Sequence, residues 1–405
     1  MSPSLEDGLN SVSPGYLNES VSRACDILMA FRFEGELLRL RDLVERTGLS
    51  KATAFRIVNT LTSRGLVERA GRFQYRSKTR LLQHRNLTLG YAAQTSEFAF
   101  SRAVTESIER AAAKEGISLI AVNNRYSTKI ALRNADLLIR EKVALVMEFQ
   151  IDEHVAPIIS GKYREAGIPM IAIEIPHPGA IYYGADNYRA GLMGGRYLGR
   201  WAKQHWEGRV DEVILLEVPR AGPLPQSRLA GALQGLKEVL PSAENAGIFR
   251  FDCNGQFGRS LNLVRNHLRS TRAQRTLVAA INDPSAIGAL RAFEEAGRAQ
   301  NCAVMGQNAS VEARSEMRRL GSRLIGSVGY FPEKYGDGLI PLALEIIHKK
   351  HAPPAIFVEH KLVTPDNVDQ LYPNDPLLEA AAIDEMLFVP SGAKAGELTV
   401  SPEQT

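Results

Sequence analysis

The stretch from Leu40 to Arg64 most constrains what this chain can fold into, because it carries two helical periods separated by a turn. Gly48 lies between the periods and can take the positive φ that a tight turn needs. Leu49 follows it and is expected to pack back into the core, and Ser50 is a favourable N-cap residue. The apolar positions recur at helical spacing in both halves, at Leu40, Leu43 and Val44 and then at Ala54, Ile57, Val58 and Leu61. We therefore predict two helices joined by a sharp turn.

The face of the second helix opposite its apolar stripe suits contact with DNA. Short polar side chains, an Arg and an Asn can reach base edges in a major groove. The free amides at the start of the helix can bind a phosphate. We predict that this face contacts DNA through Ser50, Lys51, Ala52, Thr53, Phe55, Arg56 and Asn59.

A hairpin pattern follows the two helices. An apolar run leads to the turn Ala70–Gly71, after which Phe73 and Tyr75 alternate with polar residues. Such a hairpin after a helix-turn-helix forms a wing, and Arg72 within it joins the predicted DNA contacts. Upstream, residues 21–33 have an apolar face from Val21, Ala24, Cys25, Leu28 and Phe31, which predicts a packing helix.

The segments SVSRACDIL, LRDLVERTGLSKATAFRIVNTL and SRGLVERAGRFQYR make residues 20–77 resemble the winged helix-turn-helix of the IclR-type regulators. The resemblance implies binding to double-stranded operator DNA. The alternative is a small helical packing domain with no DNA function. The wing and the local charge argue against that alternative.

The positive charge of the chain is concentrated in this region. Residues 37–85 hold twelve Lys or Arg against three Asp or Glu, whereas residues 86–405 hold 35 against 36. Release of counterions from DNA would then supply much of the affinity, so we expect binding to weaken with salt.

Other bulk features indicate a cytoplasmic protein of two or three domains. The 405 residues contain no apolar run long enough to span a bilayer. Residues 1–19 are rich in Ser, Gly, Pro and Asn, so we expect them to be disordered and not a secretory signal. The three scattered cysteines indicate reduced thiols. No CxxC pair or His/Cys cluster predicts a metal site, and we expect no cofactor.

From Leu87 onward, apolar runs typical of buried strands alternate with helical segments, which predicts parallel sheets in two similar lobes. Four segments, ADNYRAGLMGGRYL, SRLAGALQGL, INDPSAIGALRAFEEAG and LVTPDNVD, resemble the type I periplasmic binding proteins and the sugar-responsive LacI-like effector domains. The fold class is then α/β, with a winged helix-turn-helix before a two-lobed domain of Rossmann-like lobes. The predicted boundaries are 20–77 for the winged domain, 78–86 for a linker, 87–370 for the two-lobed domain and 371–405 for a tail.

The resemblance also divides the two-lobed domain. It implies that residues 86–185 with 331–353 form one lobe and residues 186–330 with 354–370 the other. Ligands in such sheets lie beyond the carboxyl ends of strands. Asp186 and Asn187 fall at the first crossing between the lobes, where they would support the hinge.

The resemblance assigns roles to several strand-end residues. Phe98 and Phe100 would stack on a sugar face, although both could equally be core aromatics. Glu174 would accept hydrogen bonds from sugar hydroxyls, but Ile175 stands where the family often has Arg. Arg228 would donate charge-assisted hydrogen bonds to the ligand, with a surface ion pair as the alternative.

The remaining predicted ligand residues follow later strands. Phe257 would cover the ligand, and Asn282 would face the cleft while Asp283 caps the next helix. Asn308 replaces an Asp that is usual in the sugar binders, and Tyr330 replaces a polar amide. An amide donates as well as accepts, so the ligand could present an acceptor at Asn308.

These features predict a ligand-responsive DNA-binding transcriptional regulator, acting as a homodimer on a two-fold symmetric operator. Its small polar effector would be a sugar or a sugar-like polyol. No nucleotide-binding loop, nucleophile elbow or HExxH motif occurs, so we expect no enzyme activity. A transport-type binding protein, a sugar-active enzyme on the same fold and a regulator tuned by a protein partner are the alternatives.

Overall fold

The computed structural model describes residues 18–31, 36–78, 87–349 and 351–388. The first residues, for which we predicted disorder, lie outside these ranges. Most of the predicted linker and the end of the predicted tail lie outside them as well. Contacts divide the chain into two compact units, residues 1–88 with 110–119 and residues 89–109 with 120–405. Within the described ranges, no helix is both long and apolar enough to cross a membrane.

The N-terminal part contains the helix-turn-helix at the predicted positions. Helix α1 covers Glu19–Met29, α2 covers Leu40–Thr47 and α3 covers Lys51–Ser63. Gly48 ends α2 with a φ of 68°, in the left-handed region, and the side chain of Ser50 accepts the Thr53 N–H at 3.2 Å. Both local predictions are therefore confirmed.

The wing is a sheet of three strands, one more than the sequence predicted. Strands β2 (Val67–Arg69) and β3 (Gln74–Ser77) form the expected antiparallel pair, and β1 (Leu38–Arg39) adds to the other edge of β3. Helix α1 buries Ile27 and Leu28, and Phe31 follows them into the core. Val21 is 60% exposed. The predicted apolar face of α1 was therefore wrong at Val21 and at Cys25, which is also exposed, because helix packing selects the face that holds Ile27.

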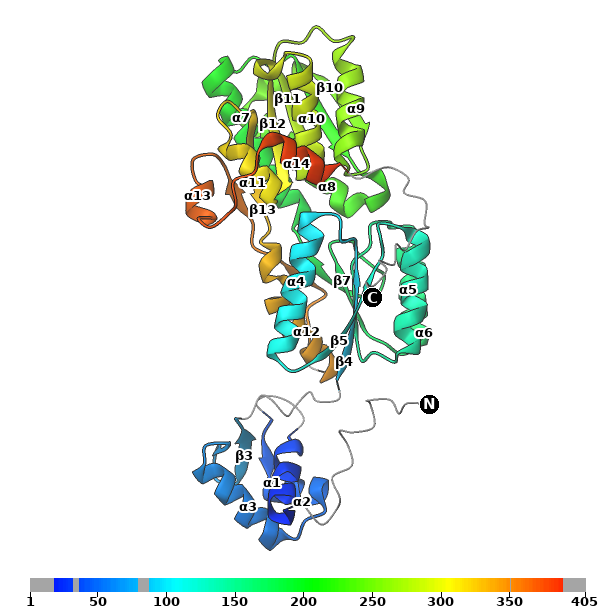
Figure 1. The fold of residues 1–405 in the computed structure, drawn as a ribbon, viewed down its shortest axis with the longest axis vertical. Coiled ribbons are helices and arrows are strands. Elements are labelled where there is room, and N and C mark those ends of the chain that lie inside the picture. The colour runs from blue at the N-terminus through cyan, green and yellow to red at the C-terminus, as the bar shows by residue number, and fades with distance from the viewer. Residues whose placement is uncertain (1–17, 32–35, 79–86, 350, 389–405) are drawn as a thin grey trace, which may run out of the picture. The chain divides into compact units, whose positions relative to one another are not determined.

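The first lobe is a sheet of six strands in the order β14-β8-β7-β6-β4-β5. Helices α4 (Ala99–Lys114) and α12 (Tyr335–Ile347) lie on one side of it, and α5 (Thr128–Arg140) and α6 (Ala156–Glu165) lie on the other (Figure 1). The strands are β4 (Thr88–Ala93), β5 (Ser118–Asn123), β6 (Val146–Glu148), β7 (Met170–Ile173), β8 (Ile181–Gly184) and β14 (Ala355–Phe357).

The second lobe has the strand order β10-β9-β11-β12-β13-β15. Its strands are β9 (Glu212–Glu217), β10 (Gly247–Asp252), β11 (Thr276–Ala280), β12 (Cys302–Asn308), β13 (Leu324–Gly329) and β15 (Lys361–Val363). Its helices are α7 (Asn187–Trp206), α8 (Pro223–Val239), α9 (Phe257–Leu268), α10 (Asp283–Glu295) and α11 (Val311–Arg318). Short 3-10 turns occur at Pro219–Ala221, Pro241–Asn245, Ala299–Asn301 and Pro332–Lys334.

Strand alternation builds two cores around this second sheet. Val213 and Leu215 of β9 pack on the face covered by α7 and α8, whereas Ile214 and Leu216 pack on the face covered by α9 and α10. The apolar residues of β9 do not alternate with polar ones, because both faces of this strand are buried.

Helices α7 and α8 approach each other closely through glycine. A Cβ atom on Gly191 would lie 1.7 Å from the carbonyl oxygen of Arg228. The glycine therefore sets the position of Arg228 relative to α7.

The chain crosses between lobes three times, and the third crossing differs from the prediction. We expected residues 354–370 to belong to the second lobe. However, β14 pairs in parallel with β8 of the first lobe, and only β15 joins the second, antiparallel to β13. The third crossing therefore lies between Phe357 and Lys361. Beyond it are α13 (Val368–Leu371), at the predicted end of the two-lobed domain, and α14 (Ala380–Leu387), in the predicted tail.

Candidate ligand cavity and DNA-binding face

A cavity of about 100 Å³ lies between the two lobes at the carboxyl ends of their strands. Strand order reverses between β4 and β6 in the first sheet and between β9 and β11 in the second. Residues that follow all four of these strands line the cavity, among them Gln94, Phe149, Val218 and Asn282. Ligands of open α/β sheets bind at such reversal points. The volume is room for about seven to ten water-sized groups, which suits one small polar molecule.

Six of the eight predicted ligand residues line this cavity, namely Phe98, Phe100, Glu174, Arg228, Asn282 and Asn308. The other two lie outside its lining. Phe257 is 4% exposed and packs in the core between α9, α10 and the second sheet. Tyr330 is 1% exposed, and its hydroxyl donates to the side chain of Gln307.

Aromatic rings form one wall of the cavity. The ring of Phe100 meets those of Phe149, Tyr330 and Tyr335 edge-on, with centroids 5.7–6.4 Å apart. Phe98 meets Tyr126 in the same way at 5.2 Å. Both predicted aromatics are half-buried, so they pack against neighbours and still offer a surface to a ligand.

Glu174 and Arg228 both line the cavity, with 3.8 Å between the guanidinium and the carboxylate. The carboxylate of Glu174 accepts hydrogen bonds from the Tyr335 hydroxyl and from the Ala185 N–H at 3.2 Å. Its backbone has a φ of 61°, which is costly for a residue with a side chain. Burial raises the pKa of Glu174, and the nearby Arg228 guanidinium opposes that rise. The carboxylate is thus held in place by the first lobe before any ligand binds.

Arg228 is fixed by the crossings between the lobes. Its Nε and Nη2 both donate to Asn187 Oδ1, at 3.1 and 2.6 Å, and its Nη1 donates to the Ile281 carbonyl at 2.6 Å. The guanidinium carbon lies 5.1 Å from the centre of the Tyr330 ring. Asn187 therefore lies at the first crossing and holds Arg228, and Tyr330 lies against Arg228 outside the cavity lining.

A second contact links two of the crossings. The Asp186 N–H donates to His360 Nε2 at 3.2 Å, and the His360 ring meets Tyr330 edge-on at 5.3 Å. Burial lowers the pKa of His360, which favours the neutral ring that this hydrogen bond needs.

The cap at the start of α10 differs from the prediction. We expected Asp283 to cap this helix, but Asn282 does so, because its Oδ1 accepts the Ser285 N–H at 3.1 Å. Asp283 is the first residue of the helix, where it is buried and accepts hydrogen bonds from the Ser310 N–H and the Ser327 hydroxyl. Burial raises its pKa to about 7. Asn282 thus both caps the helix and lines the cavity.

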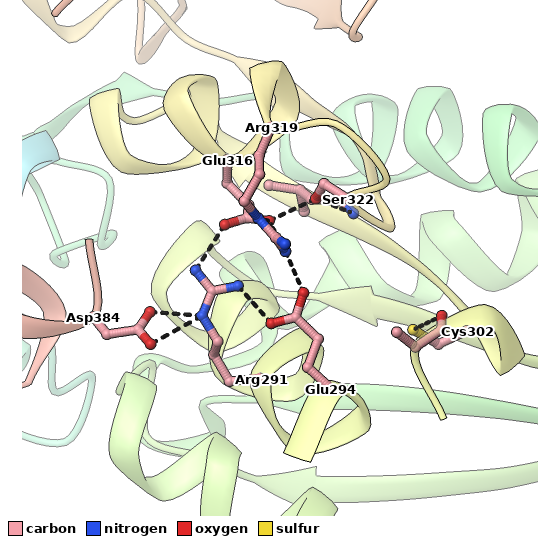
Figure 2. A network of polar contacts seen from close by, with 9 residues as sticks. Arg291, Glu294, Cys302, Glu316, Arg319, Ser322 and Asp384 are labelled. Atoms are coloured by element: carbon pink, nitrogen blue, oxygen red, sulfur yellow. Dashed lines mark hydrogen bonds and ion pairs between the residues drawn. The ribbon is translucent and has the colours of Figure 1, made fainter. Parts of the chain in front are cut away.

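The C-terminal helix α14 adds Leu387 to the cavity lining. The helix is anchored on the second lobe by Ile383 and Leu387, which pack in its core, and by Asp384, which accepts hydrogen bonds from Arg291 Nε at 2.7 and 3.0 Å. Figure 2 shows that Arg291 also bonds Glu294 and Glu316, so that one guanidinium ties α10, α11 and α14 together.

Sequence reasoning missed Leu387 and Glu312. Leu387 reaches the cavity through long-range docking of a short helix from the predicted tail. Glu312 lies in the first turn of α11, where an acidic residue normally indicates a solvated helix start. Glu312 lies four residues after Asn308, which ends strand β12. This closeness to a strand end is the sequence feature that could have indicated a cavity residue.

None of the predicted DNA-binding residues is buried. Ser50, Lys51, Ala52, Phe55, Arg56 and Arg72 are exposed, and Thr53 and Asn59 are half-buried. On the opposite face of α3, Ala54, Val58 and Leu61 are buried against α1 and α2. The packing of the three helices therefore leaves the predicted reading face free. No group of three or more potential metal-ligating side chains occurs among the residues that the structure places.

The fold and the cavity define a two-lobed solute-binding domain, in one chain with a winged helix-turn-helix. The chain belongs to the periplasmic binding protein domain family, whose sequence pattern matches residues 89–351. Residues 20–71 match the IclR helix-turn-helix domain. Both are families of binding domains and not of enzymes.

Solved structures share the fold of the two-lobed part. A periplasmic solute-binding protein of an ABC transporter from Actinobacillus succinogenes 130z, with bound D-allose, is 21% identical with a TM-score of 0.62, and the match covers 70% of this chain and 100% of that one. A solute-binding protein from Bacillus halodurans C-125, with bound myo-inositol, is 18% identical with a TM-score of 0.60, covering 71% and 97%. A search of curated proteins found no match.

Proposed function

We propose that this protein is a cytoplasmic transcriptional regulator that binds operator DNA through α3 and the wing and senses a sugar or polyol in the cavity. The observation that carries the proposal is the combination, in one chain, of an exposed reading helix and a cavity at both strand-reversal points. A carrier protein would have no use for the first, and a constitutive DNA-binding protein would have no use for the second.

The chemistry of the cavity supports a polyhydroxylated effector. Carboxylate, guanidinium and amide groups from Glu174, Arg228, Asn282 and Asn308 line it beside the ring of Phe98. This mixture of an aromatic surface with directional donors and acceptors suits a molecule whose ring is apolar on its face and hydroxylated at its edge. D-allose and myo-inositol, which relatives of the fold hold, are molecules of this kind.

The regulatory step follows from linkage. If the effector binds one arrangement of the lobes more tightly, and if that arrangement favours one placement of paired DNA-binding domains, effector and operator affinities change each other by the same factor. A homodimer on a two-fold symmetric operator would provide the pairing.

A thermal-shift screen tests the sensing function. The full chain would be heated with D-allose, myo-inositol, D-galactose, L-arabinose and glycerol, each at several concentrations. An effector that binds the native state raises the melting temperature by mass action, by about 2.7 kcal/mol of stability at one hundred times its Kd. An unchanged melting temperature with every sugar and polyol would contradict the proposal.

A further inference from the structure

Glu312 is a buried carboxylate, one oxygen of which has no hydrogen-bonding partner among the described residues. Its side chain is 1% exposed and lines the cavity. Its Oε2 atom is fully buried and accepts no hydrogen bond from any described residue. Leaving such a group unsatisfied costs free energy, because water is lost and nothing replaces it.

The nearest cation does not compensate this carboxylate. Arg102 Nη2, on α4 of the first lobe, lies 3.9 Å from Glu312 Oε1, beyond hydrogen-bonding distance. The Arg102 side chain is 38% exposed, and its Nη1 already donates to the carbonyls of Ser96 and Glu97 at 3.1 and 2.7 Å. A buried ion pair offsets its desolvation only when its geometry is good and its other atoms are hydrogen-bonded. Neither condition holds here.

The start of α11 does not compensate it either. The side chain of Ser310 caps this helix by accepting the Ala313 N–H at 3.3 Å. An acidic residue in a first turn gains from the helix dipole, but by less than about 1 kcal/mol at an exposed site. That gain does not explain why the carboxylate is buried in the cavity rather than solvated.

The other charged side chains of the cavity have hydrogen-bonding partners within the chain, unlike Glu312 Oε2. Among the described residues of the lining, the charged side chains are Glu174, Arg228 and Glu312. Glu174 accepts hydrogen bonds from Tyr335 and Ala185, and Arg228 donates to Asn187 and Ile281. Glu312 is therefore the lining charge that is left for something outside the chain to satisfy.

We propose that Glu312 is an effector-binding residue, which accepts a hydrogen bond from an O–H or N–H donor of the bound molecule through Oε2. The inference rests on the proposed sensing function and adds to it. The effector presents this donor where the start of α11 lines the cavity. A hydroxyl and an ammonium group share this chemistry, and the test separates them.

The test is calorimetry of the full chain and of Glu312→Gln with D-allose, myo-inositol, D-galactose and D-galactosamine. We expect at least one of these to bind the wild-type chain, and its Kd to rise at least tenfold in Glu312→Gln. A tenfold preference for D-galactosamine over D-galactose that disappears in the variant assigns the donor as ammonium. Equal affinity for the two assigns it as hydroxyl.

Melting of the ligand-free proteins separates a binding role from a structural one. Removing an uncompensated buried charge should leave the melting temperature of Glu312→Gln unchanged or higher. Glu316→Gln is the matched control, one helical turn along α11, where the carboxylate bonds Arg291, Arg319 and Ser322. It should melt several degrees lower, because it breaks satisfied contacts.

Two results would overturn the proposal. One is a Kd in Glu312→Gln within twofold of wild type for a sugar whose binding is lost in Arg228→Gln. The cavity would then bind sugars, as proposed for the function, without Glu312. The other is a Glu312→Gln protein that melts as low as Glu316→Gln. If none of the four probes binds the wild-type chain, and L-arabinose and glycerol do not bind it either, the sensing function itself fails, and this inference fails with it.

Discussion

The guanidinium of Arg228 lies 3.8 Å from the carboxylate of Glu174, and the two residues belong to different lobes. Both side chains line the cavity. Arg228 also holds Asn187, next to the first crossing, while Glu174 holds Ala185 just before it. A molecule that contacts either side chain therefore contacts a group that is hydrogen-bonded next to the first crossing between the lobes.

Replacing Arg228 by Lys should weaken sugar binding at least tenfold and lower the melting temperature by several degrees. Lys cannot reproduce the forked donation to Asn187 Oδ1 together with the bond to the Ile281 carbonyl. Calorimetry and thermal melting measure the two effects. Arg196→Lys is the control, because Arg196 pairs with Glu238 on the surface and should contribute less than about 1 kcal/mol. Sugar affinity within twofold of wild type in Arg228→Lys would remove this residue from the site.

Replacing Arg56 by Ala should collapse the preference for operator over random DNA while leaving the melting temperature unchanged. Arg56 is exposed on α3, and one good contact from such a side chain to a base edge is worth about 1–3 kcal/mol. Arg41→Ala, at the exposed start of α2, removes the same charge and should reduce affinity for all DNA without changing the preference. Gel-shift titrations with operator and scrambled duplexes decide the point. An unaltered preference in Arg56→Ala would place the reading face elsewhere.

Glu148 should make the stability of the protein fall as pH rises above about 5. It is fully buried, accepts the Asn124 side-chain N–H at 2.9 Å, and has its pKa raised by burial to about 8. Between the ordinary pKa of 4.5 and this value, the folded chain keeps a proton that the unfolded chain releases. Stability is therefore lost as pH rises through that window, by a few kcal/mol.

The measurement is the melting temperature at pH 5 and pH 8 for the wild-type chain and for Glu148→Gln. The variant cannot ionise at this position, so its melting temperature should fall less between the two pH values. Equal falls in the two proteins would show that Glu148 does not have a raised pKa in the folded state.

Replacing Asp384 by Asn should loosen α14. Sugar binding should weaken as a result, because α14 places Leu387 in the cavity lining. The carboxylate is 35% exposed, so the cost to stability should be about 1–2 kcal/mol, below that of a fully buried pair. Asp369→Asn is the matched control, since Asp369 is 83% exposed where it pairs with Arg318. We expect the control to melt like wild type. If Asp384→Asn does so too, the network in Figure 2 does not anchor the helix.

The sequence predicted those features that depend on local pattern. The turn at Gly48, the cap at Ser50 and the antiparallel wing follow from backbone preference and periodicity. The resemblance to the sugar-binding families selected Phe98, Glu174 and Asn308 near strand ends and Arg228 within α8, and all four line the cavity.

Features that depend on long-range packing were missed. Strand β1 has two residues and carries no period, so it could not be recognised before β3 was placed beside it. The pairing of β14 with β8 is a tertiary choice between two available sheet edges. We predicted Phe257 as a ligand-binding residue because we placed it in a loop. Its burial between α9 and α10 depends on tertiary packing, which the sequence does not show.

The most direct test of the account is operator binding by the full chain with and without a sugar. An operator fragment selected from random DNA would be titrated by fluorescence anisotropy, at fixed salt, with D-allose, myo-inositol or D-galactose at saturation. The account predicts that a sugar that raises the melting temperature also changes operator affinity at least fivefold, which corresponds to about 1 kcal/mol of coupling. An operator affinity that stays the same when the cavity is filled would contradict it.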